Sequence, residues 1–196
     1  IAEARALGAT FALSSVLVPF FLGATIGAVA SGQVSVPPDA SAPFSSSTNA
    51  TSLYIGALAV ATSSYMAAVF VAADAVRAKQ PDLIEAFRKR ALGAGLVTGL
   101  MAIGGIFVVR SDSPHLYDGL TSGFGLVVVI GSALAGLVTL GLLLQRRFGL
   151  ARVSSAAAVA AIIVGLVAAI SPDFLPGQLT LEQAAAPDAT LVPMLV

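Results

Sequence analysis

The chain has 196 residues, of which 57% are hydrophobic and only 10% charged, with a formal net charge of zero and a mean hydropathy of +0.95. Charged residues make up about a quarter of an ordinary soluble domain, so this composition excludes that class and indicates a membrane protein. The absence of cysteine excludes disulfides and thiolate metal sites, and the ten basic residues form no patch suited to nucleic acid.

Five charge-poor apolar stretches divide the chain. An α-helix rises about 1.5 Å per residue, so a stretch of about 20 residues crosses a hydrocarbon core of about 30 Å. The predicted fold is therefore all-α: a polytopic transmembrane helix bundle with five spanning helices, forming one transmembrane helical domain over 1–196. The predicted spans are residues 7–30, 53–73, 91–109, 124–144 and 153–170, followed by a tail, 171–196.

The basic residues orient these spans. Nine of the ten lie before the first span or in the connections that follow the second and fourth spans. Only Arg110 lies on the other side. Short cytoplasmic loops carry an excess of Lys and Arg. The predicted cytoplasmic loops are 77–90 and 145–152, and the predicted outward segments are 31–52, 110–123 and 171–196.

The first span contains Pro19, followed by Gly23 and Gly27. Proline removes one backbone donor and commonly kinks a helix, which membranes tolerate when neighbouring groups satisfy the freed carbonyl. Two glycines four residues apart permit close approach of another helix. Two interpretations stay open here: plain helix packing and a functional hinge.

The second span ends with Asp74 and Arg77. Residues three apart share a helix face, so these two side chains can form an ion pair at the cytoplasmic boundary. The alternatives are that Asp74 makes a polar contact to a partner subunit or conducts protons.

The connection after the second span contains 81–87, which we expect to form a short amphipathic helix on the inner surface, because Pro81 and the acids after it suit a first helical turn. The third and fourth spans carry further small-residue faces, and we expect all such faces to build the bundle and a subunit interface. The small-residue pairs are Gly23/Gly27, Gly95/Gly99 and Gly131/Ala135.

Residues that carry chemistry are scarce. His115 is the only histidine and lies in the expected outward loop 113–119, and no span centre carries a charge. Haem held between helices needs ligands within spans, and ion carriers need buried ionisable groups. We therefore expect no catalytic, cofactor-binding or metal-binding residues in this chain, and predict a helix bundle that supports chemistry located elsewhere.

Several ordered pieces of the chain carry a resemblance to a known family. They lie in and after the first span, at the end of the second, after the third, and in the tail. The pieces are residues 14–23 with Gly27, 31–34, 72–75, 116–120, 172–176, 179–181 and 184–191. Together they resemble subunit II of cytochrome bd-type quinol oxidases, in its later, C-terminal part. The resemblance is collinear and covers nearly the whole chain.

The resemblance implies a complex of the bacterial plasma membrane that oxidises quinol and reduces dioxygen to water. It implies that haem b, haem d and the main quinol site belong to the partner, subunit I. Subunit II would be a haem-free helical partner, needed for assembly and implicated in proton supply. The family's last matched span often ends with Trp-Gly, whereas this chain has no tryptophan.

Other interpretations remain. The chain starts close to a span and ends in an apolar run, so we expect it to be a fragment of a larger subunit. The alternative function is a fragment of a small-molecule membrane permease, in which the glycine-rich first span would line a substrate path. A third interpretation is a pure assembly factor, which would not stay in the mature complex.

Overall fold

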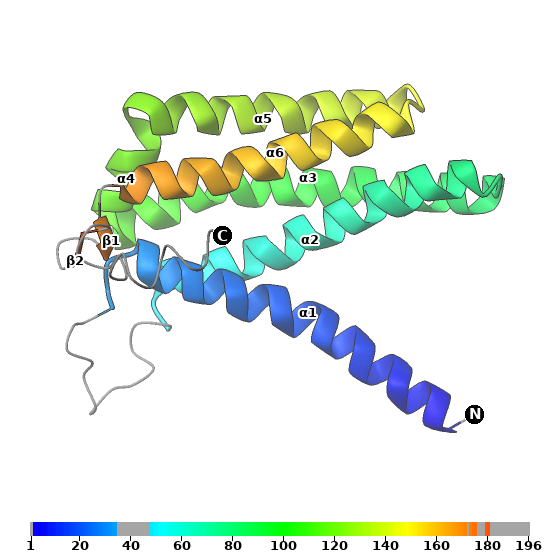
Figure 1. The fold of residues 1–196 in the computed structure, drawn as a ribbon, viewed down its shortest axis with the longest axis horizontal. Helices are drawn as coiled ribbons and strands as arrows, with labels where there is room; N and C mark the ends of the chain where they lie inside the picture. The colour runs from blue at the N-terminus through cyan, green and yellow to red at the C-terminus, as the bar shows by residue number, and fades with distance from the viewer. Residues whose placement is uncertain (1, 35–47, 172, 176–178, 181–196) are drawn as a thin grey trace, which may run out of the picture.

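The computed structural model describes residues 2–34, 48–171, 173–175 and 179–180. Within these residues, six helices are followed by a small antiparallel pair of strands (Figure 1). The helices are α1 (Ala2–Ala30), α2 (Ala50–Arg77), α3 (Pro81–Asp112), α4 (Pro114–Thr121), α5 (Gly123–Leu144) and α6 (Phe148–Ile170), and the strands are β1 (Asp173–Leu175) and β2 (Leu179–Thr180). Most of the predicted tail lies outside the described residues. This includes the whole piece 184–191 and parts of the pieces 172–176 and 179–181.

The five predicted spans are confirmed, because five helices are long and apolar enough to cross a membrane. The expected separate helix 81–87 is wrong, because those residues are the first turns of α3. Nothing between Phe87 and Ala91 breaks the helix, and the ion pair from Arg88 to Glu85, at 2.9 Å, supports it locally. The 32 residues of α3 measure about 48 Å, so α3 projects well beyond a hydrocarbon core of about 30 Å.

The expected loop 113–119 is also mostly helical, since α4 occupies Pro114–Thr121. Proline begins α4, and the fully buried Leu116 anchors it to the bundle. Gly119 lies against the backbone of Ala169 in α6, where a Cβ atom would clash. The close approach at Gly119 therefore fixes α4 across the end of the bundle.

The helices run back and forth between two ends (Figure 1). The turns 78–80 and 145–147 lie at one end, which we call the arginine-rich end, together with the start of α1. The end of α1, the start of α2, α4 and the strands lie at the other, which we call the opposite end. The predicted alternation of basic and non-basic connections thus agrees with the arrangement of the helices.

Helix α2 is central. It packs along α1 on one side and along α3 on the other, and these three helices form one group. Helices α5 and α6 pack along each other and form a second group. The two groups meet where α2 contacts α6 and where α3 contacts α5. One buried cluster near the arginine-rich end joins α2, α3, α5 and α6, around Val69, Ala91, Leu143 and Ala151. A smaller cluster near the opposite end contains Leu116.

Glycines allow α1 to approach α2 closely. A Cβ atom at Gly23 would lie 2.6 Å from the Ala59 Cβ atom, and one at Gly27 would lie 2.8 Å from the Ser52 Cα atom. From the other side, a Cβ atom at Gly56 would lie 2.8 Å from the Phe20 carbonyl oxygen. In a bilayer, where apolar burial gives little driving force between helices, such backbone proximity supplies the packing attraction.

Hydroxyl groups connect the other helices. The Ser132 hydroxyl of α5 donates to the Ala158 carbonyl oxygen of α6, and the Ser154 hydroxyl of α6 donates to the Ala135 carbonyl oxygen of α5, both at 2.9 Å. Between α2 and α3, the Tyr54 hydroxyl donates to the Met101 carbonyl oxygen at 2.7 Å. Each such bond contributes roughly 0.6 kcal/mol in a membrane protein.

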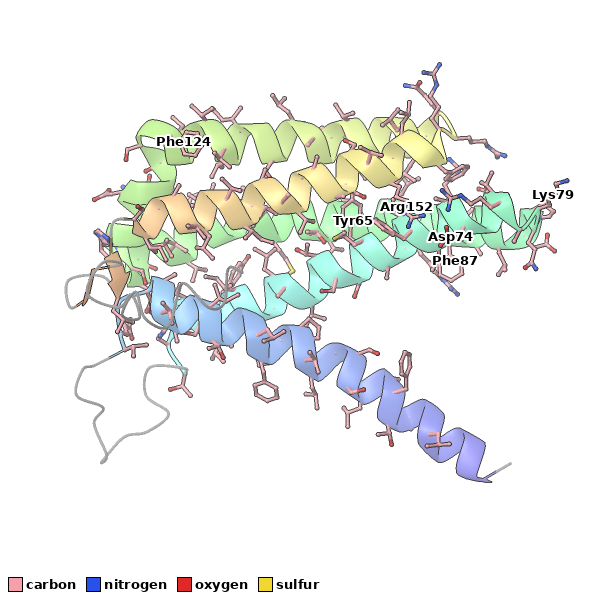
Figure 2. All side chains as sticks on the ribbon, viewed as in Figure 1. Tyr65, Asp74, Lys79, Phe87, Phe124 and Arg152 are labelled. Atoms are coloured by element: carbon pink, nitrogen blue, oxygen red, sulfur yellow. The ribbon has the colours of Figure 1, made fainter. Side chains whose placement is uncertain are left out.

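Much of the apolar surface is not covered by this chain. Within the most apolar window of each candidate span, between 11% and 28% of the residues are buried inside the structure. Apolar side chains project outward from α1 and α5 in particular (Figure 2). Surfaces of this kind are covered in a membrane by lipid or by other helices.

We predict that Gly23→Leu destabilises the α1–α2 contact. The added side chain has no room beside Ala59, and overpacking of this kind costs about 1–3 kcal/mol. The apparent unfolding midpoint of the detergent-extracted protein should fall by about 5 °C, measured by size-exclusion chromatography after heating.

The matched control is Gly8→Leu in the same helix, where a Cβ atom would meet nothing within 4 Å. Equal midpoints for the Gly23→Leu and Gly8→Leu variants would contradict the importance of this contact.

Candidate functional site at the arginine-rich end

Asp74 is the centre of an ion-pair cluster near the end of α2. Its Oδ1 atom lies 3.5 Å from Nη1 of Arg77 and 3.1 Å from Nη1 of Arg152 in α6. The pairing with Arg77 was expected, but Arg77 is 75% exposed, whereas Arg152 is 33% exposed. The closer and less exposed partner of Asp74 therefore comes from another helix.

Packing holds Arg152 in place. Its guanidinium carbon lies 4.3 Å from the centroid of the Phe70 ring in α2, in a cation–π arrangement. Arg152 thus contacts α2 twice, through Phe70 and Asp74, as Figure 2 shows for the latter. A partial signal was present in the sequence, because Arg152 and Asp74 lie near the same predicted end of their spans, but the sequence could not set the register between α2 and α6.

Glu85 makes a second link of the same kind. It accepts hydrogen bonds from Arg88, at 2.9 and 3.1 Å, and from Arg146, at 3.2 Å. Arg146 belongs to the α5–α6 turn, so this contact joins α3 to that turn. Carboxylates on α2 and α3 therefore each hold an arginine from the second half of the chain.

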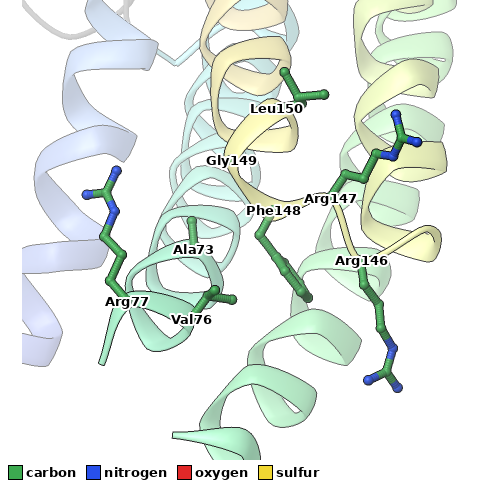
Figure 3. Close-up of a pocket in the computed structure, with 8 residues that line it drawn as sticks. All are labelled: Ala73, Val76, Arg77, Arg146, Arg147, Phe148, Gly149 and Leu150. Carbon is green, nitrogen blue, oxygen red and sulfur yellow. The ribbon is translucent and has the colours of Figure 1, made fainter. Parts of the chain in front are cut away.

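A hollow of about 500 Å³ lies beside this cluster, between the end of α2 and the start of α6 (Figure 3). It is lined by three arginines, by the first residues of α6, and by apolar side chains from both helices. The lining residues are Ala73, Val76, Arg77, Arg146, Arg147, Phe148, Gly149 and Leu150.

The predicted packing residues fall into two groups. One group makes close contacts. A Cβ atom at Gly95 would lie 2.8 Å from the Leu140 side chain and 2.9 Å from the Tyr65 ring. The Ala135 carbonyl oxygen accepts the hydrogen bond from Ser154 described above. At Gly99 and Gly131 a Cβ atom would meet nothing within 4 Å. These two glycines therefore make no close helix contact within the described residues.

Pro19 lies inside an α1 that continues through it. The described residues of α1 before Pro19, from Leu7 on, are exposed, whereas Gly23 and Gly27 after it are buried against α2. Pro19 therefore marks the point where α1 joins the rest of the bundle, which is consistent with both the packing and the hinge interpretation.

The spans carry hydroxyls rather than charges at depth. Among the described residues, the buried hydroxyls of Tyr65 and Thr98 have no hydrogen-bond partner. Thr139 lies close to Tyr65, but its hydroxyl donates to the Ala135 carbonyl oxygen at 2.8 Å. His115 is exposed on α4, and no group of three His, Cys, Asp or Glu residues within the described part of the chain is placed to hold a metal ion.

The opposite end has a polar contact that sequence reasoning missed. The backbone N–H of Thr51, in the first turn of α2, donates to Oδ2 of Asp112 at the end of α3, at 3.0 Å. The Thr51 and Ser113 hydroxyls lie 3.1 Å apart and are buried. Asn49 caps the same helix by accepting from the Ser52 N–H at 2.7 Å. This cluster satisfies helix-end groups and holds α2 to α3.

A comparison with known families gives a match over residues 2–196 to the family described as cytochrome bd terminal oxidase subunit II. The chain belongs to this family. No curated protein and no solved structure was found to match the chain.

Membership of the subunit II family confirms the resemblance noted in the sequence, and three described pieces of that resemblance lie at helix contacts. Residues 14–23 and Gly27 include the close approach of α1 to α2, 72–75 contain Asp74, and 116–120 contain Gly119 against α6. These pieces of the subunit II chain thus build and close the bundle. A multi-pass membrane subunit of a terminal oxidase follows from the family and the five spans.

We predict that Asp74 and Arg152 are energetically coupled. In a double-mutant cycle with Asp74→Asn, Arg152→Gln and the double variant, the coupling free energy should be about 1 kcal/mol or less, because both side chains are partly exposed. The matched cycle with Arg77→Gln should give a smaller value, because the Arg77 contact is longer and more exposed.

Thermal unfolding of the purified complex measures both cycles. A larger coupling to Arg77 than to Arg152 would contradict the inter-helix assignment. The same Asp74→Asn complex should keep its oxidase turnover within a few-fold of the parent if Asp74 acts by pairing. Loss of turnover in a fully assembled complex would instead indicate a role for Asp74 in proton transfer.

Proposed function

We propose that this chain is the haem-free supporting subunit of a bacterial terminal quinol oxidase of the cytochrome bd type. The complex would oxidise quinol and reduce dioxygen to water, and this chain would stabilise the haem-bearing subunit I and shape proton access. The observation that carries the proposal is the family match over nearly the whole chain.

The distribution of ligand residues supports a haem-free role. The only histidine, His115, lies on α4 at the opposite end and outside the five candidate spans, and the chain has no cysteine. Haem in membrane oxidoreductases is commonly held by histidine, with cysteine or methionine as other ligands, and of these the candidate spans contain only Met66 and Met101, with no histidine beside them. We therefore assign haem b, haem d and the main quinol site to the partner subunit, with no catalytic residue in this chain.

The uncovered helix surfaces support a role in assembly. Gly99 on α3 and Gly131 on α5 are exposed small residues with open space around them. Small residues on an exposed helix face permit close approach of a helix from another subunit. We propose that these two faces contact subunit I or other helices of the same complex, while the remaining apolar surface meets lipid.

The charge distribution supports a passive role in proton supply. The described acids of this chain lie near helix ends, on α4 or in β1, not at span centres, and Asp74 and Glu85 at the arginine-rich end are paired with arginines. A proton path through a membrane needs ionisable groups or water at depth. We propose that this chain excludes lipid and water from the flank of subunit I, with its arginine-rich end in the cytoplasm of a bacterial plasma membrane.

Co-purification tests the proposal. The chain, expressed with its natural neighbours and extracted in mild detergent, should bring down a haem-bearing partner at fixed stoichiometry. Its visible spectrum should show haem b and haem d, and the complex should consume oxygen when given quinol. A control purification from a strain without subunit I should give a colourless chain in lower yield.

A colourless, self-contained oligomer from the complete strain would contradict the proposal and would favour the permease interpretation. A partner that is recovered only before the complex matures would favour the assembly-factor interpretation, and would also contradict a permanent supporting role.

A further inference from the structure

The hollow at the arginine-rich end combines positive charge with an apolar wall. Arg77 extends from α2, and Arg146 and Arg147 extend from the α5–α6 turn, while no carboxylate lines the hollow (Figure 3). Val76 and Leu150 add exposed apolar side chains on the two sides, at 42% and 56% exposure. Charge and apolar surface thus adjoin each other where the candidate span α2 ends and the candidate span α6 begins.

The surrounding charges leave this region positive. Five arginines gather here, and the two carboxylates among them, Asp74 and Glu85, are each shared between two arginines. The five are Arg77, Arg88, Arg146, Arg147 and Arg152. Arg147 makes no ion pair within the described part of the chain. Within this cluster, the five arginines exceed the two carboxylates by three positive charges.

The backbone adds to this potential. Helix α6 begins at Phe148, and the residue before it, Arg147, provides no side-chain cap for the first turn. The N–H groups of a first helical turn have no partner inside the helix, and the N-terminus carries a partial positive charge. Phe148, Gly149 and Leu150, the first turn of α6, all line the hollow. A negatively charged group in the hollow would therefore meet both arginines and the positive end of a helix.

We propose that this hollow binds the phosphate headgroup of an anionic phospholipid, with the first part of its acyl chain against Val76 and Leu150. Basic pockets between transmembrane helices at a membrane boundary suit acidic headgroups, and the apolar wall favours a lipid over a soluble anion. The guanidinium groups of the three arginines stand at the rim and point in different directions in Figure 3. Binding therefore requires them to swing inward, which their exposed positions permit.

Native mass spectrometry of the purified complex tests the proposal. The complex is delipidated and exchanged into mixed micelles that contain phosphatidylglycerol or phosphatidylcholine with the same acyl chains. The parent complex should retain phosphatidylglycerol in preference to phosphatidylcholine. Each arginine near a membrane surface strengthens the binding of anionic lipid about fivefold, so the Arg77→Gln/Arg147→Gln double variant should retain about 25-fold less.

The matched control is Lys79→Gln/Lys89→Gln, which removes two positive charges at the same end but outside the lining of the hollow. Its loss should stay below about threefold, because neither lysine lines the hollow and salt screens exposed charges that make no direct contact with the lipid. The Arg147→Lys variant should keep most of the retention, since it keeps the charge, and thermal unfolding shows whether each variant is folded.

Three results would overturn the proposal. Equal losses in the two double variants would mean a general charge effect, without a site in the hollow. Displacement of the lipid by inorganic phosphate at millimolar concentration would mean a soluble-anion site. A density map of the complex with protein over the hollow would mean that a partner subunit, and not a lipid, covers these arginines.

Discussion

The hydrocarbon interior of a bilayer offers no hydrogen-bond partner, and the structure of this chain follows from that constraint. Serine and tyrosine hydroxyls inside the spans donate to carbonyl oxygens of neighbouring helices, as Ser132, Ser154 and Tyr54 do. Such bonds form only where helices lie close together. The small residues that permit this proximity, such as Gly23 against Ala59 and Gly104 beside the Tyr54 hydroxyl, are therefore as important to the fold as the hydroxyls themselves.

The same constraint moves charge to the two ends of the bundle, where water is available. At the arginine-rich end, Asp74 and Glu85 bind arginines from α6 and the α5–α6 turn, and at the opposite end Asp112 binds the first turn of α2. A buried apolar cluster lies near each set of contacts. The bundle is thus held at both ends, with close helix contacts at small residues between them, and its outer apolar faces are not covered by this chain.

Hydropathy alone predicted the five spans, because a helix that crosses a membrane must be apolar over its whole length. Local spacing also predicted that Asp74 and Arg77 can meet. The pairing of Asp74 with Arg152 could not be predicted, because these residues are 78 positions apart in the chain. Whether they meet depends on the register between α2 and α6. Helix α4 was missed because proline, serine and glycine in 113–119 are typical of loops, whereas burial of Leu116 stabilises a helix there. Glycine spacing showed where close approach is permitted but not where it occurs, since Gly23 and Gly95 have close partners and Gly99 and Gly131 have none in the described chain.

Charge in the described spans lies at the ends of the bundle, and the proposed topology puts the arginine-rich end in the cytoplasm. Thiol labelling with a membrane-impermeant maleimide tests it most directly, because the chain has no cysteine of its own. The exposed positions His115, Gln145 and Leu134 report on the opposite end, the arginine-rich end and the middle of α5. We expect His115→Cys to be labelled in intact cells, Gln145→Cys only after permeabilisation, and Leu134→Cys in neither case. Labelling of Gln145→Cys from outside, or ready labelling of Leu134→Cys, would contradict this topology.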